Sequence, residues 1–131
     1  VTLLDLADRV LLAATPDLAA LHDATQIIQL SRSLAYPAGK ISFVLNRAGL
    51  PGGVRTRDIE AALRHEVFAE IPDDGQNALR SVNRGIPMLL KYPRSPFSRA
   101  VQRLAKTLAD FGRDEPAAAG RSKCCRVSKA S

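Results

Sequence analysis

Three short polar segments could carry chemistry in this sequence, because each follows directly after an apolar run. They are Thr15-Pro16-Asp17, Asn46-Arg47 and Pro72-Asp73-Asp74. Their hydroxyl, carboxamide, guanidinium and carboxylate groups can hold a ligand through hydrogen bonds or charge. Each segment also has a structural interpretation, as a helix cap or a turn, and taken singly that interpretation is the simpler one. Their role therefore depends on whether the fold brings them together.

Other chemistry has little support in the sequence. His22 and His65 lack a second histidine or cysteine at metal-ligand spacing, and the adjacent pair Cys124-Cys125 lacks the spacing of a redox or zinc motif. No nucleophile is accompanied by a recognisable base and orienting group. We therefore expect no metal site and no catalytic residue in this chain.

The apolar runs that precede the polar segments predict three strands, the first two of them buried. Their residues are 10–15, 41–45 and 67–71. Between the first two runs, apolar residues recur every three or four positions, which predicts an amphipathic helix of about 18 residues. Thr15 is placed to cap this helix, with Pro16 at its first position and Asp17 in its first turn. A strand, helix and strand of these lengths join parallel neighbours through a right-handed crossover.

Further helices are expected before and after these strands. Residues 1–7 read as the end of a helix, and a short helix begins near Thr56. Another helix ends at Gly85, where glycine is the usual left-handed stop. The last helix begins at Ser95-Pro96, a cap followed by proline, and ends at Gly112.

The alternation of strands and helices predicts the α/β class, with a partial parallel sheet in three layers and helices on its flanks. In open parallel sheets, ligands lie beyond the carboxyl ends of the strands, and all three polar segments would meet there. We expect one domain over residues 1–112. Residues 113–131 lose all periodicity and are expected to form a disordered basic tail.

The net charge of +6 over 131 residues is largely a property of the end of the chain. Removing four basic residues there leaves +2. They are Arg121, Lys123, Arg126 and Lys129. A solvated tail is the plainer interpretation, and non-specific binding to DNA or to anionic lipid is the alternative.

The chain begins at Val1 and its one methionine is Met88, so we expect a fragment of a longer protein. No apolar stretch approaches the roughly 18 to 20 residues of a membrane span, and nothing at the start resembles a signal peptide. The adjacent pair of cysteines cannot form a disulfide framework, which favours a cytoplasmic setting.

Five segments in order resemble the C-terminal half of the MinD/ParA-type P-loop ATPases, whose fold is of the SIMIBI type. The segments are residues 10–24, 44–47, 67–74, 83–87 and 93–98. The resemblance covers roughly residues 1–112. Two of its pieces look most like the CpaE/TadZ proteins of Flp-type (Tad) pilus assembly, namely Arg84-Gly-Ile-Pro87 and Arg94-Ser-Pro-Phe-Ser98.

The resemblance implies a nucleotide site at the polar segments. In the family, the asparagine matching Asn46 hydrogen-bonds the adenine edge, with Arg47 beside the base. A carboxamide suits this task because it offers both a donor and an acceptor. The segment matching Pro72 and Asp73 forms the other wall of the adenine pocket, and the aspartate matching Asp23 lies near the dimer interface. ATP and Mg²⁺ are the cofactors that the resemblance implies for the longer parent protein.

The family's phosphate-binding Walker A loop and its Walker B aspartate have no match in this chain. The glycine-rich stretch from Gly49 to Gly53 lacks an adjacent lysine and hydroxyl residue, so we expect an ordinary loop there. Phosphoryl transfer needs phosphate and magnesium contacts. We therefore expect this chain alone to be inactive and to bind ATP only weakly.

The leading hypothesis is that the parent is a cytoplasmic, ATP-dependent homodimer. It would position pilus-secretion machinery at the cell pole or at the membrane periphery. One alternative is a non-enzymatic polar scaffold with a degenerate nucleotide site. Another is a ParA-like DNA-partition ATPase, which would use a basic patch around the last helix. The patch residues are Lys91, Arg94, Arg99, Arg103 and Lys106.

Overall fold

The computed structural model describes residues 2–111 of the chain. Its elements follow in this order: α1 (Thr2–Leu6), β1 (Val10–Ala14), α2 (Leu18–Ser33), β2 (Ile41–Ala48), α3 (Thr56–Leu63), β3 (Val67–Pro72), α4 (Gly75–Arg84), α5 (Met88–Lys91) and α6 (Pro96–Phe111). The expected tail over residues 113–131 lies outside the described residues, as does Gly112.

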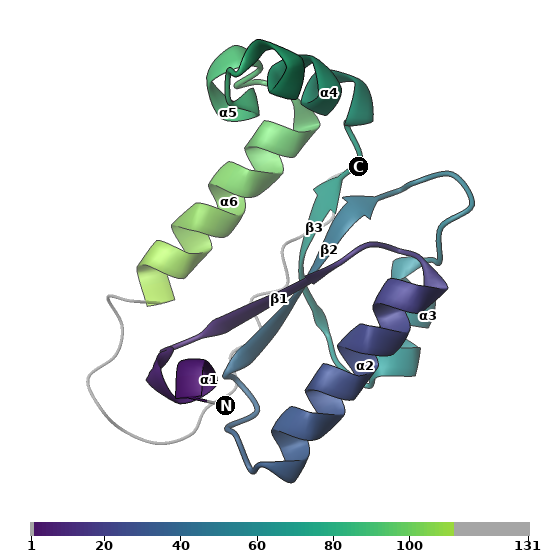
Figure 1. Cartoon of the computed structure of the whole chain (residues 1–131), viewed down its shortest axis with the longest axis vertical. Coiled ribbons are helices and arrows are strands. Elements are labelled where there is room, and N and C mark those ends of the chain that lie inside the picture. The colour runs from purple at the N-terminus through teal and green to yellow at the C-terminus, as the bar shows by residue number, and fades with distance from the viewer. Residues whose placement is uncertain (1, 112–131) are drawn as a thin grey trace.

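The three strands form one parallel sheet in the order β1-β2-β3 (Figure 1). This confirms the predicted α/β class and the parallel pairing. The pairing of β1 with β2 is regular, and Leu12 lies opposite Phe43. The pairing of β2 with β3 shifts register twice. At the second shift Asn46 pairs with Ile71 and Ala48 with Pro72, so that Arg47 is the extra residue of a bulge.

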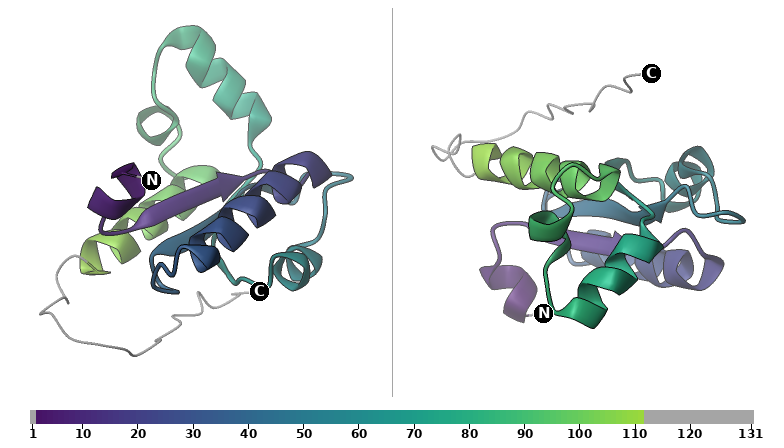
Figure 2. Two further views of the ribbon diagram at one scale, coloured as in Figure 1. Left: turned by 60° about the horizontal axis from the view of Figure 1, so that its bottom comes forward. Right: turned by 90° about the horizontal axis from the view of Figure 1, so that it is seen from above.

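The sheet is the middle of three layers, with α2 and α3 against one face and α6 against the other (Figure 1, Figure 2). α2 has the predicted amphipathic character, because its buried residues recur at spacings of three and four. They join side chains of β2 and α3 in the main core. Its members are Leu21, Ala24, Ile28, Phe43, Leu45, Ile59 and Leu63.

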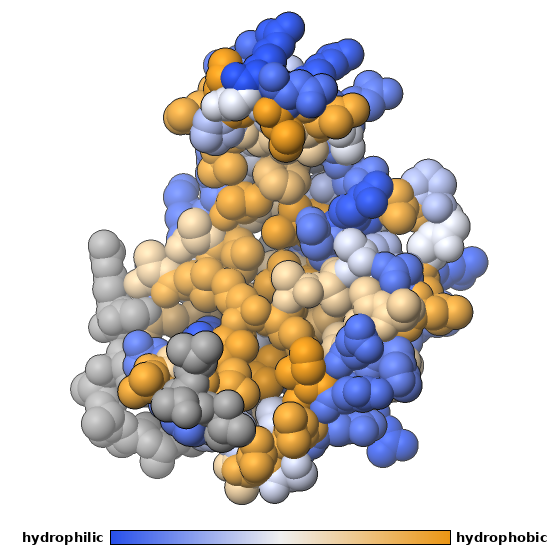
Figure 3. Space-filling view, in the orientation of Figure 1, coloured by the Kyte–Doolittle hydropathy of each residue, from blue (hydrophilic) through white to orange (hydrophobic). Residues whose placement is uncertain are grey.

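The strands differ in burial, which corrects one expectation. In β2 the residues from Ile41 to Leu45 are all buried, as predicted for a strand covered on both faces. For β1 that prediction is wrong, because the strand lies at an edge of the described sheet and Leu11 is 42% exposed. Residues Leu12 and Ala14 pack on the main core, while Leu11 and Ala13 lie on the opposite face. Figure 3 shows apolar surface across the middle of the molecule, where β1 runs.

α4 and α5 form a helical hairpin that projects beyond the carboxyl ends of the strands (Figure 1, Figure 2). Gly85 ends α4 in the left-handed conformation (φ 63°), as predicted. The single turn α5 was not expected from the sequence. α6 begins as predicted, since the hydroxyl of Ser95 accepts a hydrogen bond from the Ser98 N–H at 3.1 Å. The hairpin exposes several large apolar side chains: Leu79, Val82, Ile86, Leu89 and Leu90.

Candidate functional site at the carboxyl edge of the sheet

The polar segments meet at one edge of the sheet because the three strands are parallel. Two backbone hydrogen bonds connect them. Val54 N–H donates to the Pro16 carbonyl at 2.9 Å, and Asp73 N–H donates to the Ala48 carbonyl at 3.1 Å. The loop after β2 is thereby attached to the end of β1, and the end of β3 is attached to the end of β2.

The glycine-rich stretch between β2 and α3 forms part of this connection. Gly53 lies so close to the end of β1 that an added Cβ would be 3.0 Å from the Pro16 Cγ and 3.0 Å from the Leu50 carbonyl oxygen. Only glycine fits there without displacing a neighbour. The stretch is therefore a packed connecting loop, in agreement with the expectation from the sequence.

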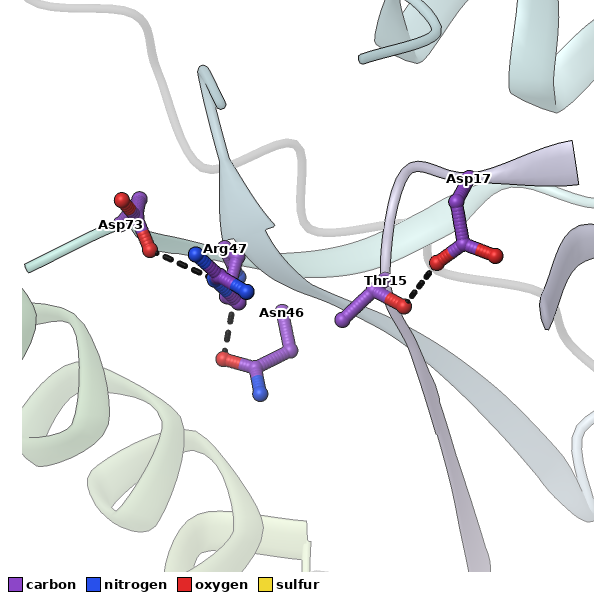
Figure 4. A network of polar contacts seen from close by, with 5 residues as sticks. All are labelled: Thr15, Asp17, Asn46, Arg47 and Asp73. Carbon is purple, nitrogen blue, oxygen red and sulfur yellow. Dashed lines mark hydrogen bonds and ion pairs between the residues drawn. The ribbon is translucent and has the colours of Figure 1, made fainter. Parts of the chain in front are cut away.

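The end of β1 forms a helix cap that differs from the prediction. Asp17, not Thr15, is the cap residue of α2, and its Oδ1 accepts a hydrogen bond from the Ala20 N–H at 2.9 Å. The Thr15 hydroxyl donates to the other oxygen of the same carboxylate (Figure 4). As a cap, the Asp17 carboxylate is more favourable than the Thr15 hydroxyl, because its negative charge also complements the positive end of the helix dipole. The Thr15 hydrogen bond, followed by the Ala20 N–H, holds the pKa of Asp17 below its ordinary value.

The end of β2 carries Asn46 and Arg47. The strand was predicted over residues 41–45 with its end at Asn46-Arg47, but it continues to Ala48 because the backbone pairing with β3 resumes beyond the bulge. The Arg47 Nε–H donates to Asp73 Oδ1 at 2.7 Å and forms an ion pair with it. Its backbone N–H donates to Asn46 Oδ1 at 3.0 Å (Figure 4). Three residues from two strand ends thus form one connected polar cluster, in which the Asn46 side chain is linked through the Arg47 backbone.

The end of β3 supplies Pro72 and Asp73, while Asp74 precedes α4 and accepts a hydrogen bond from Asn77 Nδ2 at 3.1 Å. Of the residues predicted for a site, Asn46, Arg47, Pro72 and Asp73 lie together at this edge. Asp23 is exposed on α2 and does not belong to the cluster.

A shallow depression of about 420 Å³ lies beside the same edge, between the end of β3 and α6. Its lining residues are Pro72, Pro96, Arg99, Gln102, Arg103 and Lys106. Three of the five residues predicted for a basic patch are among them, whereas Lys91 and Arg94 are not. Pro96 and Gln102 were missed by the sequence reasoning. The recurrence of long polar side chains every three or four residues along α6 could have indicated Gln102.

The two histidines make ordinary contacts. His22 shares a hydrogen bond of 2.8 Å with Gln26 on α2, and His65 Nε2 lies 3.2 Å from the Ile41 carbonyl oxygen. Within residues 2–111, no group of three His, Cys, Asp or Glu side chains is placed to hold a metal ion. In the same part of the chain, no helix is both long and apolar enough to cross a membrane.

Comparison with known proteins finds curated relatives that match most of this chain. A scan against protein-family models finds no match. The septum site-determining protein MinD of Thermotoga maritima is 33% identical in an alignment that covers 81% of this chain and 40% of that protein. An uncharacterized ATP-binding protein of Methanocaldococcus jannaschii, MJ0169, is 30% identical over 82% of this chain and 40% of its own length. The chain thus spans about two fifths of the length of these curated relatives.

Solved structures give the same result at the level of the fold. A ParA family ATPase from Chlorobium tepidum matches 80% of this chain and 43% of its own, with 27% identity and a TM-score of 0.71. MinD from Pyrococcus horikoshii, solved with Mg-ADP, matches 81% of this chain and 43% of its own, with 22% identity and a TM-score of 0.66. In the second case the identity is low enough that the likeness concerns the fold alone.

Proposed function

Because its relatives and structural neighbours support a place for this chain in the MinD/ParA-type ATPase superfamily, we propose that it supplies the base-recognising part of an ATP-binding domain. The observation that carries the proposal is the polar cluster of Asn46, Arg47 and Asp73 beside Pro72 at the carboxyl edge of the sheet. In open parallel sheets this edge is where ligands bind. ATP and Mg²⁺ would be bound by the complete protein, with this chain contributing contacts to the adenine.

The role of Asn46 is tested by replacing it in the complete protein. Asn46→Ala should weaken ATP binding relative to GTP by about 1 to 3 kcal/mol, because a base-edge partner loses its hydrogen bonds on burial. The measurement is calorimetric competition between the two nucleotides. Asn83→Ala, at an exposed position of α4, is the matched control and should leave the preference unchanged. An unchanged preference in Asn46→Ala would make Asn46 a turn residue only.

We further propose that the complete protein is a CpaE/TadZ-like localisation ATPase of Flp/Tad pilus assembly, acting at the cell pole through nucleotide-dependent homodimerisation. The support for this branch is the sequence of two segments, Arg84–Pro87 and Arg94–Ser98. Both have clear structural roles here, since Gly85 ends α4 and the fully buried Ser98 lies in the first turn of α6. Asp23, exposed on α2, would lie at the dimer interface.

Light scattering with ATP and Mg²⁺, compared with ADP, tests the dimerisation. We expect a dimer with ATP only, and we expect Asp23→Ala to shift it toward the monomer. Asp58→Ala, at an exposed position of α3, should leave it intact. A dimer that forms regardless of nucleotide would favour the polar scaffold without nucleotide exchange. Loss of polar pili on deletion of the gene would support the cellular role.

A second candidate function, DNA partition of the ParA kind, is favoured by one observation. Arg99, Arg103 and Lys106 line a common depression on α6, which places three cations within reach of one DNA backbone. Arg99→Gln with Arg103→Gln should then reduce DNA affinity and lower the salt slope by about two. Arg57→Gln on α3 is the control. If DNA binding is unchanged in the variant that carries Arg99→Gln and Arg103→Gln, this surface is not the DNA-binding site.

A further inference from the structure

The backbone of Arg47 has a conformation that few residues with a side chain adopt. Its φ of 56° lies in the left-handed region, and it occupies the bulge where β2 and β3 change register. Such a conformation carries a cost and persists only where surrounding contacts hold it. The contacts that hold it here are therefore informative.

Those contacts form a closed ring between the ends of β2 and β3. The Arg47 side chain donates to Asp73 Oδ1 at 2.7 Å, and the Asp73 backbone N–H donates to the Ala48 carbonyl at 3.1 Å. The Arg47 backbone N–H, oriented by the same bulge, donates to Asn46 Oδ1 at 3.0 Å. Asp73 thus acts on Asn46 through Arg47.

The last of these bonds decides which atoms of the Asn46 carboxamide face outward. A carboxamide has almost the same shape when its oxygen and nitrogen are exchanged, so an unrestrained one can present either. A backbone N–H can donate a hydrogen bond to the carboxamide oxygen but not to the carboxamide nitrogen. The Asn46 nitrogen therefore points away from Arg47, and the oxygen keeps one free lone pair (Figure 4).

This orientation matters for the choice of base. Adenine presents an amino donor beside the acceptor N1, whereas the corresponding edge of guanine or hypoxanthine presents the acceptor O6 beside the donor N1–H. A carboxamide that is free to turn over can pair with either edge. One that is held in a single orientation pairs well with only one of them in a given pose.

We propose that Arg47 and Asp73 are positioning residues that hold the Asn46 carboxamide in one orientation and so give the site its preference for adenine. The inference rests on the proposed nucleotide site and adds its specificity determinant. Pro72, next to Asp73 in the chain, would contact the face of the base, while Asp73 itself acts through Arg47.

Adenosine and inosine test this proposal, because they differ in the base edge and need no phosphate contacts. Both are titrated by NMR into the 131-residue chain and into its Asp73→Ala, Asp73→Asn and Asp74→Ala variants. We expect the wild type to prefer adenosine by roughly tenfold, the ratio that one well-matched hydrogen bond gives. Asp73→Ala should reduce the ratio of the affinities for adenosine and inosine to about two. Asp73→Asn keeps an acceptor for the Arg47 Nε–H and should therefore retain most of the preference for adenosine. Asp74→Ala should leave the preference at the wild-type value.

The outcomes separate this inference from the proposed function. If neither nucleoside shifts the NMR signals of residues at the carboxyl edge of the wild-type sheet, up to its limit of solubility, the nucleotide site itself is wrong. If the wild type prefers adenosine and Asp73→Ala keeps the same ratio, the site stands and the positioning role is overturned. An equal loss of both nucleosides in Asp73→Ala, without a change in ratio, also overturns it, because Asp73 would then be only a wall of the pocket.

Discussion

At the scale of single residues, Arg9 connects parts of the fold that lie far apart in the sequence. Its guanidinium carbon lies 4.0 Å from the ring centroid of Phe111 and 5.7 Å from that of Phe68, and the two ring centroids are 6.1 Å apart. The same guanidinium donates to Ser42 Oγ at 3.4 Å. Arg9, directly before β1, therefore contacts three other elements through one cation. These elements are β2, β3 and the end of α6.

Replacing Arg9 by methionine should show how much its charge contributes. Arg9→Met retains an apolar side chain of similar reach but removes the cation–π contacts, so we expect a loss of about 0.5 to 2 kcal/mol of unfolding free energy. Urea denaturation measures it. Lys40→Met is the control, since the Lys40 Nζ lies 5.4 Å from the Tyr36 ring centroid at a more exposed site and should matter less. Equal effects of both substitutions would argue against a special role for Arg9.

The carboxylate of Asp17 gives a prediction about pH. Its folded-state pKa lies below the unfolded value, so its contribution to stability is present above that unfolded value, about 3.9, and is lost as the pH falls through the folded pKa. Thr15→Val removes the largest cause and should raise the pKa of Asp17 in an NMR titration of the carboxyl groups. The acid-induced fall of Tm below about pH 4 should become smaller in this variant. Thr25→Val is the control. It removes a hydroxyl that donates to the Leu21 carbonyl and not to a carboxylate, so the pKa of Asp17 should stay unchanged.

At the scale of the elements, helices with similar sequence patterns differ in what they contribute. α3 places Ile59 and Leu63 in the main core, and Ile59 is fully buried. α4 is also strongly amphipathic, yet Val82 is 77% exposed. Amphipathic character therefore shows that a helix has an apolar face, but not that another element of the described chain covers it.

This difference can be measured with a matched pair of truncations. Ile59→Ala should cost about 2 to 5 kcal/mol of unfolding free energy, because it leaves a cavity in a packed core. Val82→Ala should change it by less than about 0.5 kcal/mol. Chemical denaturation of both variants is the measurement. A large cost at Val82 would mean that α4 is covered in solution.

The sequence predicted the elements well where local patterns determine them. Apolar runs indicated all three strands, and Gly85 and Ser95 marked helix ends through their own backbone chemistry. The failures depend on partners distant in the chain. The exposure of Leu11 follows from the position of β1 at an edge, and the length of β2 follows from pairing beyond a bulge. Likewise, no local signal pairs Arg47 with Asp73, 26 residues away, because that contact depends on the register of two strands.

At the scale of the whole molecule, the layers are complete over β2 and β3 but not over β1. Two helices and the buried face of the sheet enclose one core, and α6 closes the other face over β3. Beside it, Leu11 and Ala13 remain exposed on β1, as do the apolar side chains of the α4–α5 hairpin. The ligand-binding edge that we propose thus lies next to the least covered strand of the described chain.

The edge position of β1 has a consequence for the exchange of amide hydrogens with solvent. Val10 N–H donates to the Lys40 carbonyl, so the amides of Leu12 and Ala14 also face β2, while those of Leu11 and Ala13 point away from the sheet. In deuterated water, the amides of Leu11 and Ala13 should exchange roughly a hundredfold faster than that of Leu12. Exchange along this strand would then alternate from residue to residue. Uniformly slow exchange would mean that another strand pairs with β1 in solution, and the alternation would disappear with that pairing.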